Sequence, residues 1–229
     1  MVIWALSRQG AYVSDIFREV DEEVRRDQLK KLWDRYGIFI IALAVLFVAA
    51  VGGWRGYQWW QAKQAAESGA AFTSAVLLSE QGKHEEAEAA FAKVAKEGTA
   101  SYRALAGMRE AAELAVRDPK AAVVAYDGLA NNRALGPVLQ DLATLRAGYV
   151  LVDTAPFEEI RRRIEPLTGA DRTFRHSARA LLALSAWRVN DVTTARHWFG
   201  LILADGETPA GIHTQAEILM ALLGADGKS

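Results

Sequence analysis

The sequence lacks cysteine altogether, and this absence excludes several kinds of chemistry at once. Without thiols the chain can form no disulfide, offer no thiol nucleophile and bind no metal through thiolates. The absence is compatible with an oxidising compartment. Excess charge is lacking too, because 27 lysines and arginines stand against 28 acidic residues, giving a net charge of −1. No broad electrostatic field therefore points to a nucleic-acid partner, and we expect none.

Catalytic and metal-binding patterns are also missing from the sequence. The four histidines are His84, His176, His197 and His213. No two of them form an H-x-x-x-H or H-E-x-x-H pair, so we expect no metal site. The chain contains no G-x-S-x-G elbow and no Walker loop. We expect no catalytic residue, no cofactor and no small-molecule substrate; a membrane-anchored enzyme is the alternative, and a clustered polar pocket would favour it.

The most informative feature present is one apolar run, residues 37–54, GIFIIALAVLFVAAVGGW, which contains no charged residue. A membrane span needs about 20 mostly apolar residues, within a range of roughly 17 to 25. A single segment can satisfy its backbone in lipid only as a helix. The run therefore predicts one transmembrane helix. A buried core helix and a cleaved signal peptide are the alternatives, but bulky aromatic residues and a long charged segment flank the run.

Aromatic side chains gather at both ends of the run, as expected where a helix crosses the two membrane surfaces. These predicted membrane-interface residues are Trp33, Tyr36, Trp54, Tyr57, Trp59 and Trp60. Residues 18–36, just before the run, contain six lysines and arginines, namely Arg18, Arg25, Arg26, Lys30, Lys31 and Arg35, whereas Arg55 and Lys63 follow it over a similar distance. The side richer in Lys and Arg stays cytoplasmic, so the N-terminus is predicted inside and the C-terminus outside.

The segment before the run, residues 1–36, is predicted to be cytoplasmic and to contain an amphipathic helix. Ser14 or Asp15 can cap this helix, whose sequence DIFREVDEEVRRDQLKKLWDRYG is acidic at its start and basic at its end. The helix either lies on the inner leaflet or a cytosolic partner, or is a solvated flank of the span. Residues 1–13 do not fit this pattern, and one hypothesis is that the native product begins near Val13.

From Gln61 onward the sequence is helical, with Ala-rich periodic segments separated by short breaks at glycine, proline and asparagine. No segment shows the alternation typical of strands. The breaks predict short helices in antiparallel pairs. We therefore expect an all-α protein, in which residues 55–229 form a domain on the outer side of the membrane.

An internal repeat relates the second helices of these pairs. A small residue is followed four positions later by an aromatic one, in the pairs Ala87 and Phe91, Ala122 and Tyr126, and Ala195 and Phe199. A degenerate copy has Ile160 and Ile164. The leading positions 87, 122, 160 and 195 lie 35, 38 and 35 residues apart, close to the 34-residue period of tetratricopeptide repeats. The spacing predicts three to four repeats, arranged as a tetratricopeptide-like helical-hairpin solenoid.

Two further features have competing interpretations. Arg161, Arg162 and Arg163 form a basic run that is typical of a solvated helix face, with binding to an anionic partner or lipid headgroup as the alternative. Trp187 and Trp198 are expected to fill the seam between the last two helix pairs rather than to form a ligand platform.

The N-terminal DIFREVDEEVRRDQLKKLWDRYG, one span, the junction GWRGYQWWQ and the Ala-rich helical repeats together resemble the ancillary SecYEG translocon subunit (YfgM-like) family. The resemblance covers nearly the whole chain from about Ser14. It implies a single-pass protein of the bacterial inner membrane with a periplasmic tetratricopeptide domain. It further implies contact with the Sec translocon channel and with a periplasmic chaperone. The same domain family includes a periplasmic cell-division coordinator, so a scaffold for envelope biogenesis or division is the alternative.

Overall fold

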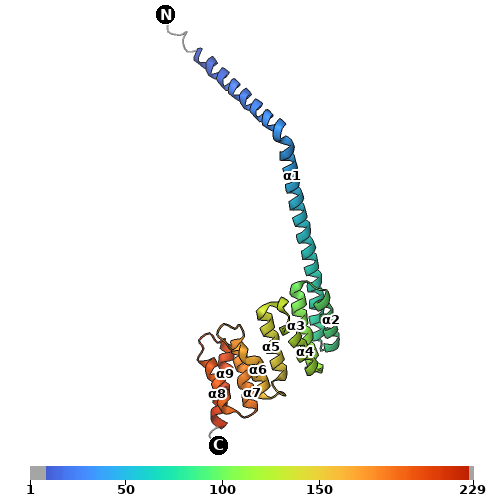
Figure 1. Ribbon diagram of the computed structural model, residues 1–229, viewed down its shortest axis with the longest axis vertical. Helices are drawn as coiled ribbons and strands as arrows, with labels where there is room; N and C mark the ends of the chain where they lie inside the picture. Colours follow the sequence, from blue (N-terminus) through green and yellow to red (C-terminus); the bar gives the residue numbers. More distant parts are fainter. Residues whose placement is uncertain (1–8, 227–229) are drawn as a thin grey trace. The chain divides into compact units, whose positions relative to one another are not determined.

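The computed structural model describes the backbone of residues 9–226, together with the side chains of residue 30 and residues 33–224. Within that range every regular element is a helix and none is a strand, which confirms the all-α prediction (Figure 1). The chain divides into two compact units, the first ending at Ala62 and the second beginning at Lys63. Residues 55–62, predicted to belong to the repeat domain, therefore group with the first unit. Residues 1–8 lie outside the described part.

The first helix, α1, runs from Gln9 to Glu80 over 72 residues. The predicted cap at Ser14 or Asp15 is therefore wrong, because both residues lie inside the helix. The physical reason is the absence of a strong helix breaker. The chain has no proline before Pro119, and a glycine inside a helix costs only about 1 kcal/mol.

The end of α1 depends on one glycine in a left-handed conformation. Gly82 has φ +73°, and the Lys83 N–H donates to the Leu78 carbonyl at 3.0 Å, as in a Schellman motif. The chain then reverses into α2, which extends from His84 to Glu97. The last part of α1 and α2 therefore form the first helix pair of the second unit.

Further pairs follow in chain order. They are α3 (Ala100–Arg117) with α4 (Pro119–Ala130), α5 (Gly136–Leu151) with α6 (Phe157–Ile164), and α7 (Arg175–Arg188) with α8 (Val192–Leu203). A short 3-10 helix precedes α5 at Arg133–Leu135, and another follows α6 at Glu165–Leu167. The last helix, α9 (Ala210–Asp226), packs against α8 and α7. The predicted breaks fall at the connections between these helices. Each second helix also contacts the first helix of the next pair, so the unit is a stack of helix pairs.

Local sequence explains where several of these helices begin. Asp118 caps α4 by accepting the Ala121 N–H at 3.0 Å, and Pro119 follows at the position where a missing N–H costs nothing. Asp191 caps α8 in the same way by accepting the Thr194 N–H at 3.0 Å. This hydrogen bonding to Thr194 lowers the pKa of Asp191 below its ordinary range.

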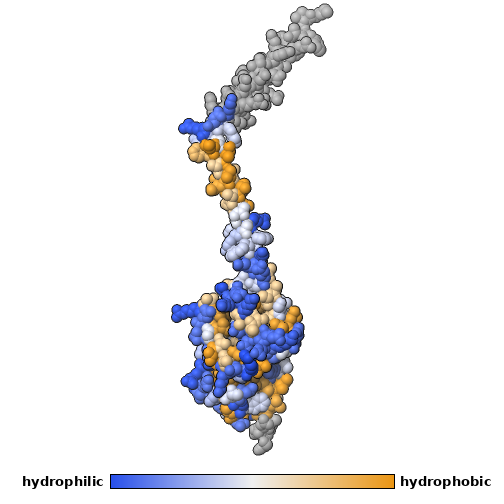
Figure 2. Space-filling model, turned by 90° about the vertical axis from the view of Figure 1, so that its right-hand side faces the viewer, coloured by the Kyte–Doolittle hydropathy of each residue, from blue (hydrophilic) through white to orange (hydrophobic). Residues whose placement is uncertain are grey.

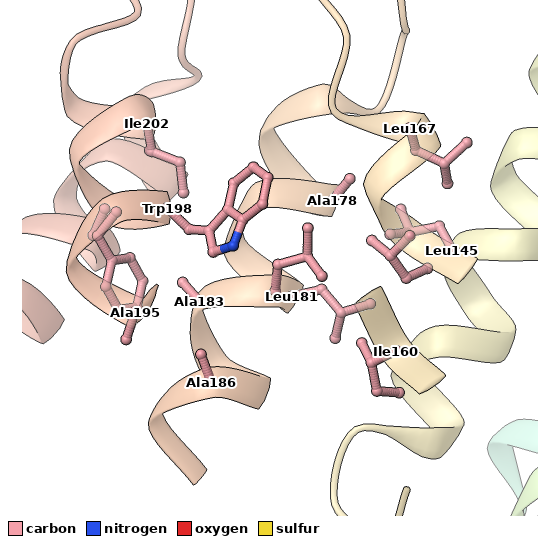
Figure 3. Close-up of a cluster of buried hydrophobic side chains, with 14 of the residues drawn as sticks. Leu145, Ile160, Leu167, Ala178, Leu181, Ala183, Ala186, Ala195, Trp198 and Ile202 are labelled. Atoms are coloured by element: carbon pink, nitrogen blue, oxygen red, sulfur yellow. The ribbon is translucent and has the colours of Figure 1, made fainter. Parts of the chain in front are cut away.

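The core of the second unit is a series of apolar clusters between the pairs. The largest lies between α5 and α9, and Figure 3 shows Trp198 of α8 pointing toward Ala178 and Leu181 of α7. Trp187 packs against the same cluster while half-buried. Alanines on facing helices let the backbones approach, and the larger side chains fill the space beside them.

Candidate interaction surfaces

The apolar part of α1 is exposed on every side. Consecutive residues 38–41 and 45–48 point around the whole helix circumference, with Ile38 76% and Phe47 69% exposed. Figure 2 shows these side chains as a hydrophobic band on α1. A helix on the surface of a soluble domain carries only one apolar stripe. Each large apolar side chain gains roughly 1.5 to 3 kcal/mol on leaving water, so this segment requires an apolar environment.

The predicted interface residues lie at both ends of this band, and all of them are exposed. They are Trp33, Tyr36, Trp54, Tyr57, Trp59 and Trp60. Gln61 donates to the Tyr57 hydroxyl at 2.8 Å, and the guanidinium of Arg35 lies 5.8 Å from the ring centre of Tyr36. The described part of the chain contains one helix, within residues 33–80, that is long and apolar enough to cross a membrane. The side chains of the amphipathic segment before residue 30 lie outside the described residues.

The six predicted repeat-packing residues are all buried in the second unit. They are Ala87 and Phe91 in α2, Ala122 and Tyr126 in α4, and Ala195 and Phe199 in α8. The ring of Phe91 meets that of Phe72 edge-on at 5.3 Å. Ile160 and Ile164, from the degenerate copy, are buried as well. The same register therefore points inward in all four pairs.

A second series of small residues, on the first helices of the pairs, faces the first series and was missed in the sequence. Its members are Ala75, Ala111, Gly148, Ala183 and Ala216, all buried. In three pairs the small residue lies twelve positions before the leading residue of the second helix, as Gly148 does before Ile160. A β-carbon on Gly148 would lie 2.6 Å from Cδ1 of Ile164. The third pair can therefore hold the large Ile160 and Ile164 because the facing residue on α5 is a glycine. This twelve-residue offset is the signal that could have revealed the series.

The first helices also carry apolar side chains that remain exposed. Leu105 and Val116 lie on α3, eleven residues apart and therefore on one face. Val138 and Tyr149 lie on α5 with the same separation. Burial raises the pKa of the Tyr149 hydroxyl, and the charge of Arg146 acts in the opposite direction. Two successive first helices, α3 and α5, thus each carry two exposed apolar side chains on one face.

A shallow groove runs along the first pair, with a volume of about 390 Å³. Its lining includes small side chains such as Ala71 and Ala90 together with the charged Glu67, Lys93 and Glu97. The groove is open and contains no histidine. Its two serine hydroxyls contact the backbone, since Ser68 accepts the Thr99 N–H at 3.1 Å and Ser74 donates to the Ala70 carbonyl at 3.0 Å.

The buried polar groups of the second unit are engaged in structural links. Glu113 is only 5% exposed; it accepts a hydrogen bond from the Ser79 hydroxyl at 2.5 Å and lies 2.7 Å from Nδ1 of His84. Because Ser79 and His84 contact different oxygens of Glu113, these three residues tie the first turn to α3 and lack the serine–histidine contact of a nucleophilic triad. The described residues contain no group of three or more His, Cys, Asp or Glu side chains that could hold a metal.

A second polar cluster holds the connection between α8 and α9 against α7. Asp205 accepts from Arg175 Nε at 3.1 Å and from Arg179 Nη1 at 2.9 Å. The Arg175 guanidinium, followed by the Glu207 N–H, holds the pKa of Asp205 well below its usual range. His176 is buried beside this cluster, where desolvation and the charge of Arg175 lower its pKa, so its ring is neutral near pH 7.

The basic run on α6 divides into three different environments. Arg161 pairs with Glu158 of its own helix at 2.6 Å. Arg163 forms a two-pronged pair with Asp127 of α4, with its second contact at 3.2 Å. Arg162 is exposed. Arg161 and Arg162 are thus exposed, as on the predicted solvated helix face, whereas Arg163 is half-buried and paired with α4.

Comparison with known proteins places this geometry in a family. A family model described as a tetratricopeptide repeat-like domain matches residues 30–199, well over half of the chain. The chain belongs to the tetratricopeptide repeat-like domain family. The match begins before the apolar run and ends within α8, so it includes the apolar part of α1 and four helix pairs, while α9 lies beyond it. No curated protein and no solved structure matches the chain.

Membership of the tetratricopeptide repeat-like family indicates how the second unit works. Repeats of this kind typically serve as non-catalytic modules that bind other proteins. The chain is therefore a protein-interaction module that carries a helix able to cross a membrane.

Proposed function

We propose that the chain is a single-pass protein of the bacterial inner membrane, in which residues 37–54 cross the bilayer, residues 1–36 are cytoplasmic and residues 55–229 form a periplasmic interaction domain. One observation carries the proposal: a single family match contains both the exposed apolar helix and the repeats. Anchoring raises the local concentration of a binding surface beside other membrane proteins, which increases the effective affinity without any new contact.

The proposed orientation follows from the excess of lysine and arginine before the apolar run. A reporter that fluoresces only in the cytoplasm tests it when fused after Ser229. We expect the fusion to stay dark, while the same reporter fused before Met1 is bright. A bright C-terminal fusion would reverse the orientation and leave the span itself intact.

The partners we propose are the Sec translocon channel and a periplasmic chaperone, which the chain would link as an ancillary subunit. The support is the resemblance of the N-terminal segment, the span and the GWRGYQWWQ junction to the ancillary SecYEG translocon subunit family. A membrane-anchored repeat domain fits this role because secreted chains emerge unfolded beside the membrane, where a repeat surface can hold a chaperone or a client.

Crosslinking in cells followed by purification in mild detergent tests these partners. We expect channel subunits and a periplasmic chaperone among the proteins recovered with the wild-type chain. A control chain that keeps residues 1–62 and ends there should lose the chaperone, because the repeat domain is absent. Recovery of cell-wall enzymes without channel subunits, together with localisation at midcell, would instead support a scaffold for envelope biogenesis or division.

A further inference from the structure

Two arginines on successive first helices have no acidic partner. Arg109 on α3 and Arg146 on α5 are both exposed, and neither forms an ion pair among the side chains that the structure describes. Other arginines of the domain do meet carboxylates: Arg117 lies 2.7 Å from Glu88, and Arg163 pairs with Asp127. The positive charges of Arg109 and Arg146 are therefore left uncompensated by the fold.

Arg109 and Arg146 occupy corresponding positions on successive first helices, each two residues before the buried small residue of its helix, Ala111 or Gly148. Tyr126 of α4, which contacts both of these helices, packs in one cluster with Ala111 of α3 and Ala147 of α5. Burial raises the pKa of the Tyr126 hydroxyl; the charges of Arg146 and Arg109 act in the opposite direction, and the charge of Glu113 acts in the same direction as burial. Two like charges thus lie at corresponding positions of successive helix pairs, an arrangement that an incoming carboxylate stabilises.

Apolar side chains accompany both arginines. Leu105, 47% exposed, lies four residues before Arg109, and Tyr149, 42% exposed, lies three residues after Arg146. Residues three or four apart are neighbours on a helix surface. Each helix therefore presents one cation beside one uncovered apolar group. These four residues are called the Arg109–Arg146 surface below.

We infer that the Arg109–Arg146 surface binds an acidic segment of another protein, in which carboxylate side chains alternate with apolar ones. The guanidinium fork matches a carboxylate with two parallel hydrogen bonds, and such charge-assisted bonds are about twice as strong as neutral ones. Leu105 and Tyr149 would cover the apolar side chains of the segment. Because the chain as a whole has a net charge of −1, its overall charge does not attract an acidic segment. The preference for acidic segments must therefore come from these two arginines. This inference rests on the proposed function of the repeat domain as an interaction module.

The direct experiment measures peptide binding to the full chain in detergent micelles by fluorescence anisotropy. One labelled peptide alternates Asp or Glu with Leu or Phe, and a matched peptide carries Asn and Gln instead of the acids. Both have amidated C-termini, so that only side chains supply carboxylates. The variant R109Q/R146Q removes the two charges. The control R133Q/R162Q makes the same charge change at exposed arginines of the α4–α5 connection and α6.

We expect the acidic peptide to bind the wild-type chain about ten-fold more tightly than the matched amide peptide, with affinity falling as salt rises. R109Q/R146Q should lose about ten-fold in affinity for the acidic peptide, while R133Q/R162Q keeps it. All variants should show the same melting temperature, since the substituted side chains are exposed. Equal binding of the two peptides, binding of neither, or an equal loss in both double variants would overturn the inference.

Failure of the Arg109–Arg146 surface can be distinguished from failure of the proposed Sec and chaperone partners. If crosslinking recovers the channel and a chaperone while neither peptide binds, the proposed partners stand and this surface falls. If the acidic peptide binds through Arg109 and Arg146 but crosslinking recovers no channel subunit, the surface stands and the Sec assignment falls.

Discussion

The apolar part of α1 and the second unit both contain many apolar residues, but they use them in opposite ways. Around α1 large side chains such as Phe47 are exposed on every side of the helix. In the second unit Phe199 is 1% exposed and belongs to a packed cluster. In the second unit, neighbouring helices bury the apolar side chains. Around the apolar part of α1, only an apolar environment outside the protein can bury them. The predictions below separate these two uses of apolar residues.

The largest expected effect distinguishes two phenylalanines. Phe199→Ala removes a buried ring and leaves a cavity, which should lower the free energy of unfolding by about 3 to 5 kcal/mol. Phe47→Ala removes a ring that touches no neighbouring helix and should change it by less than about 0.5 kcal/mol. Denaturant unfolding in detergent, followed by tryptophan fluorescence, measures both. Equal losses would show that the apolar helix packs into the protein core.

The next effect concerns the membrane and not the fold. Leu46→Arg places a charge inside the apolar run, at an insertion cost of about 2.5 to 3.5 kcal/mol. The fraction of protein in the membrane pellet should fall. Leu77→Arg, at a residue 51% exposed in the second unit, is the matched control and should leave that fraction unchanged. If L46R stays in the membrane like the wild type, the run is not the anchor.

A smaller effect is expected from two glycines in helices of the second unit. On Gly148 a β-carbon would lie 2.6 Å from Ile164 and 2.8 Å from Leu181, whereas on Gly128 it would meet no atom within 4 Å. Gly148→Val should therefore cost about 1 to 3 kcal/mol through overpacking. Gly128→Val makes the same chemical change in open space and serves as control. Thermal melting should separate the two, and a similar stability for both would mean that α5 and α6 are less tightly packed than described.

The smallest effect depends on pH. Burial, followed by the negative charge of Glu88, raises the pKa of Glu110 above its ordinary value of 4.5. Protonation therefore stabilises the folded state, and this contribution is complete below the ordinary pKa and is lost as pH rises through the raised one. At pH 7 Glu110→Gln should raise stability by about 0.5 kcal/mol, with the gain disappearing near pH 4.

Denaturant unfolding across this pH range measures the effect of Glu110→Gln. Glu86→Gln, at an exposed residue of α2, is the control and should leave stability within about 0.5 kcal/mol of the wild type. A less stable E110Q protein at pH 7 would show that the carboxylate has a favourable partner.

The features that were predicted correctly depend on local chemistry. The apolar run is visible in composition, and Gly82 and Asp118-Pro119 end or begin helices through their own backbone preferences. The period of the second helices is likewise readable, because small and aromatic residues recur at fixed spacing. The start of α1 at Gln9 was not predicted, since a capping residue marks a helix start only when the preceding residues leave the helix.

The candidate surface could not be predicted in the same way, because it depends on how distant helices pair. Arg109 of α3 and Arg146 of α5 lie on helices that are joined through α4, which contacts both of them. The contact of Gly148 with Leu181, and the link from Arg175 to Asp205, similarly join residues about 30 positions apart. Exposed arginines and apolar side chains are common in any sequence, so the sequence alone does not show which of them share one surface of the folded domain.

The central claim is that residues 37–54 anchor the repeat domain on the outer side of a cytoplasmic membrane. Protease added to intact spheroplasts, followed by blotting with separate tags before Met1 and after Ser229, tests it most directly. We predict that the C-terminal tag is lost while the N-terminal tag survives on a small membrane-bound fragment. A C-terminal tag that persists until the spheroplasts are lysed would contradict the account.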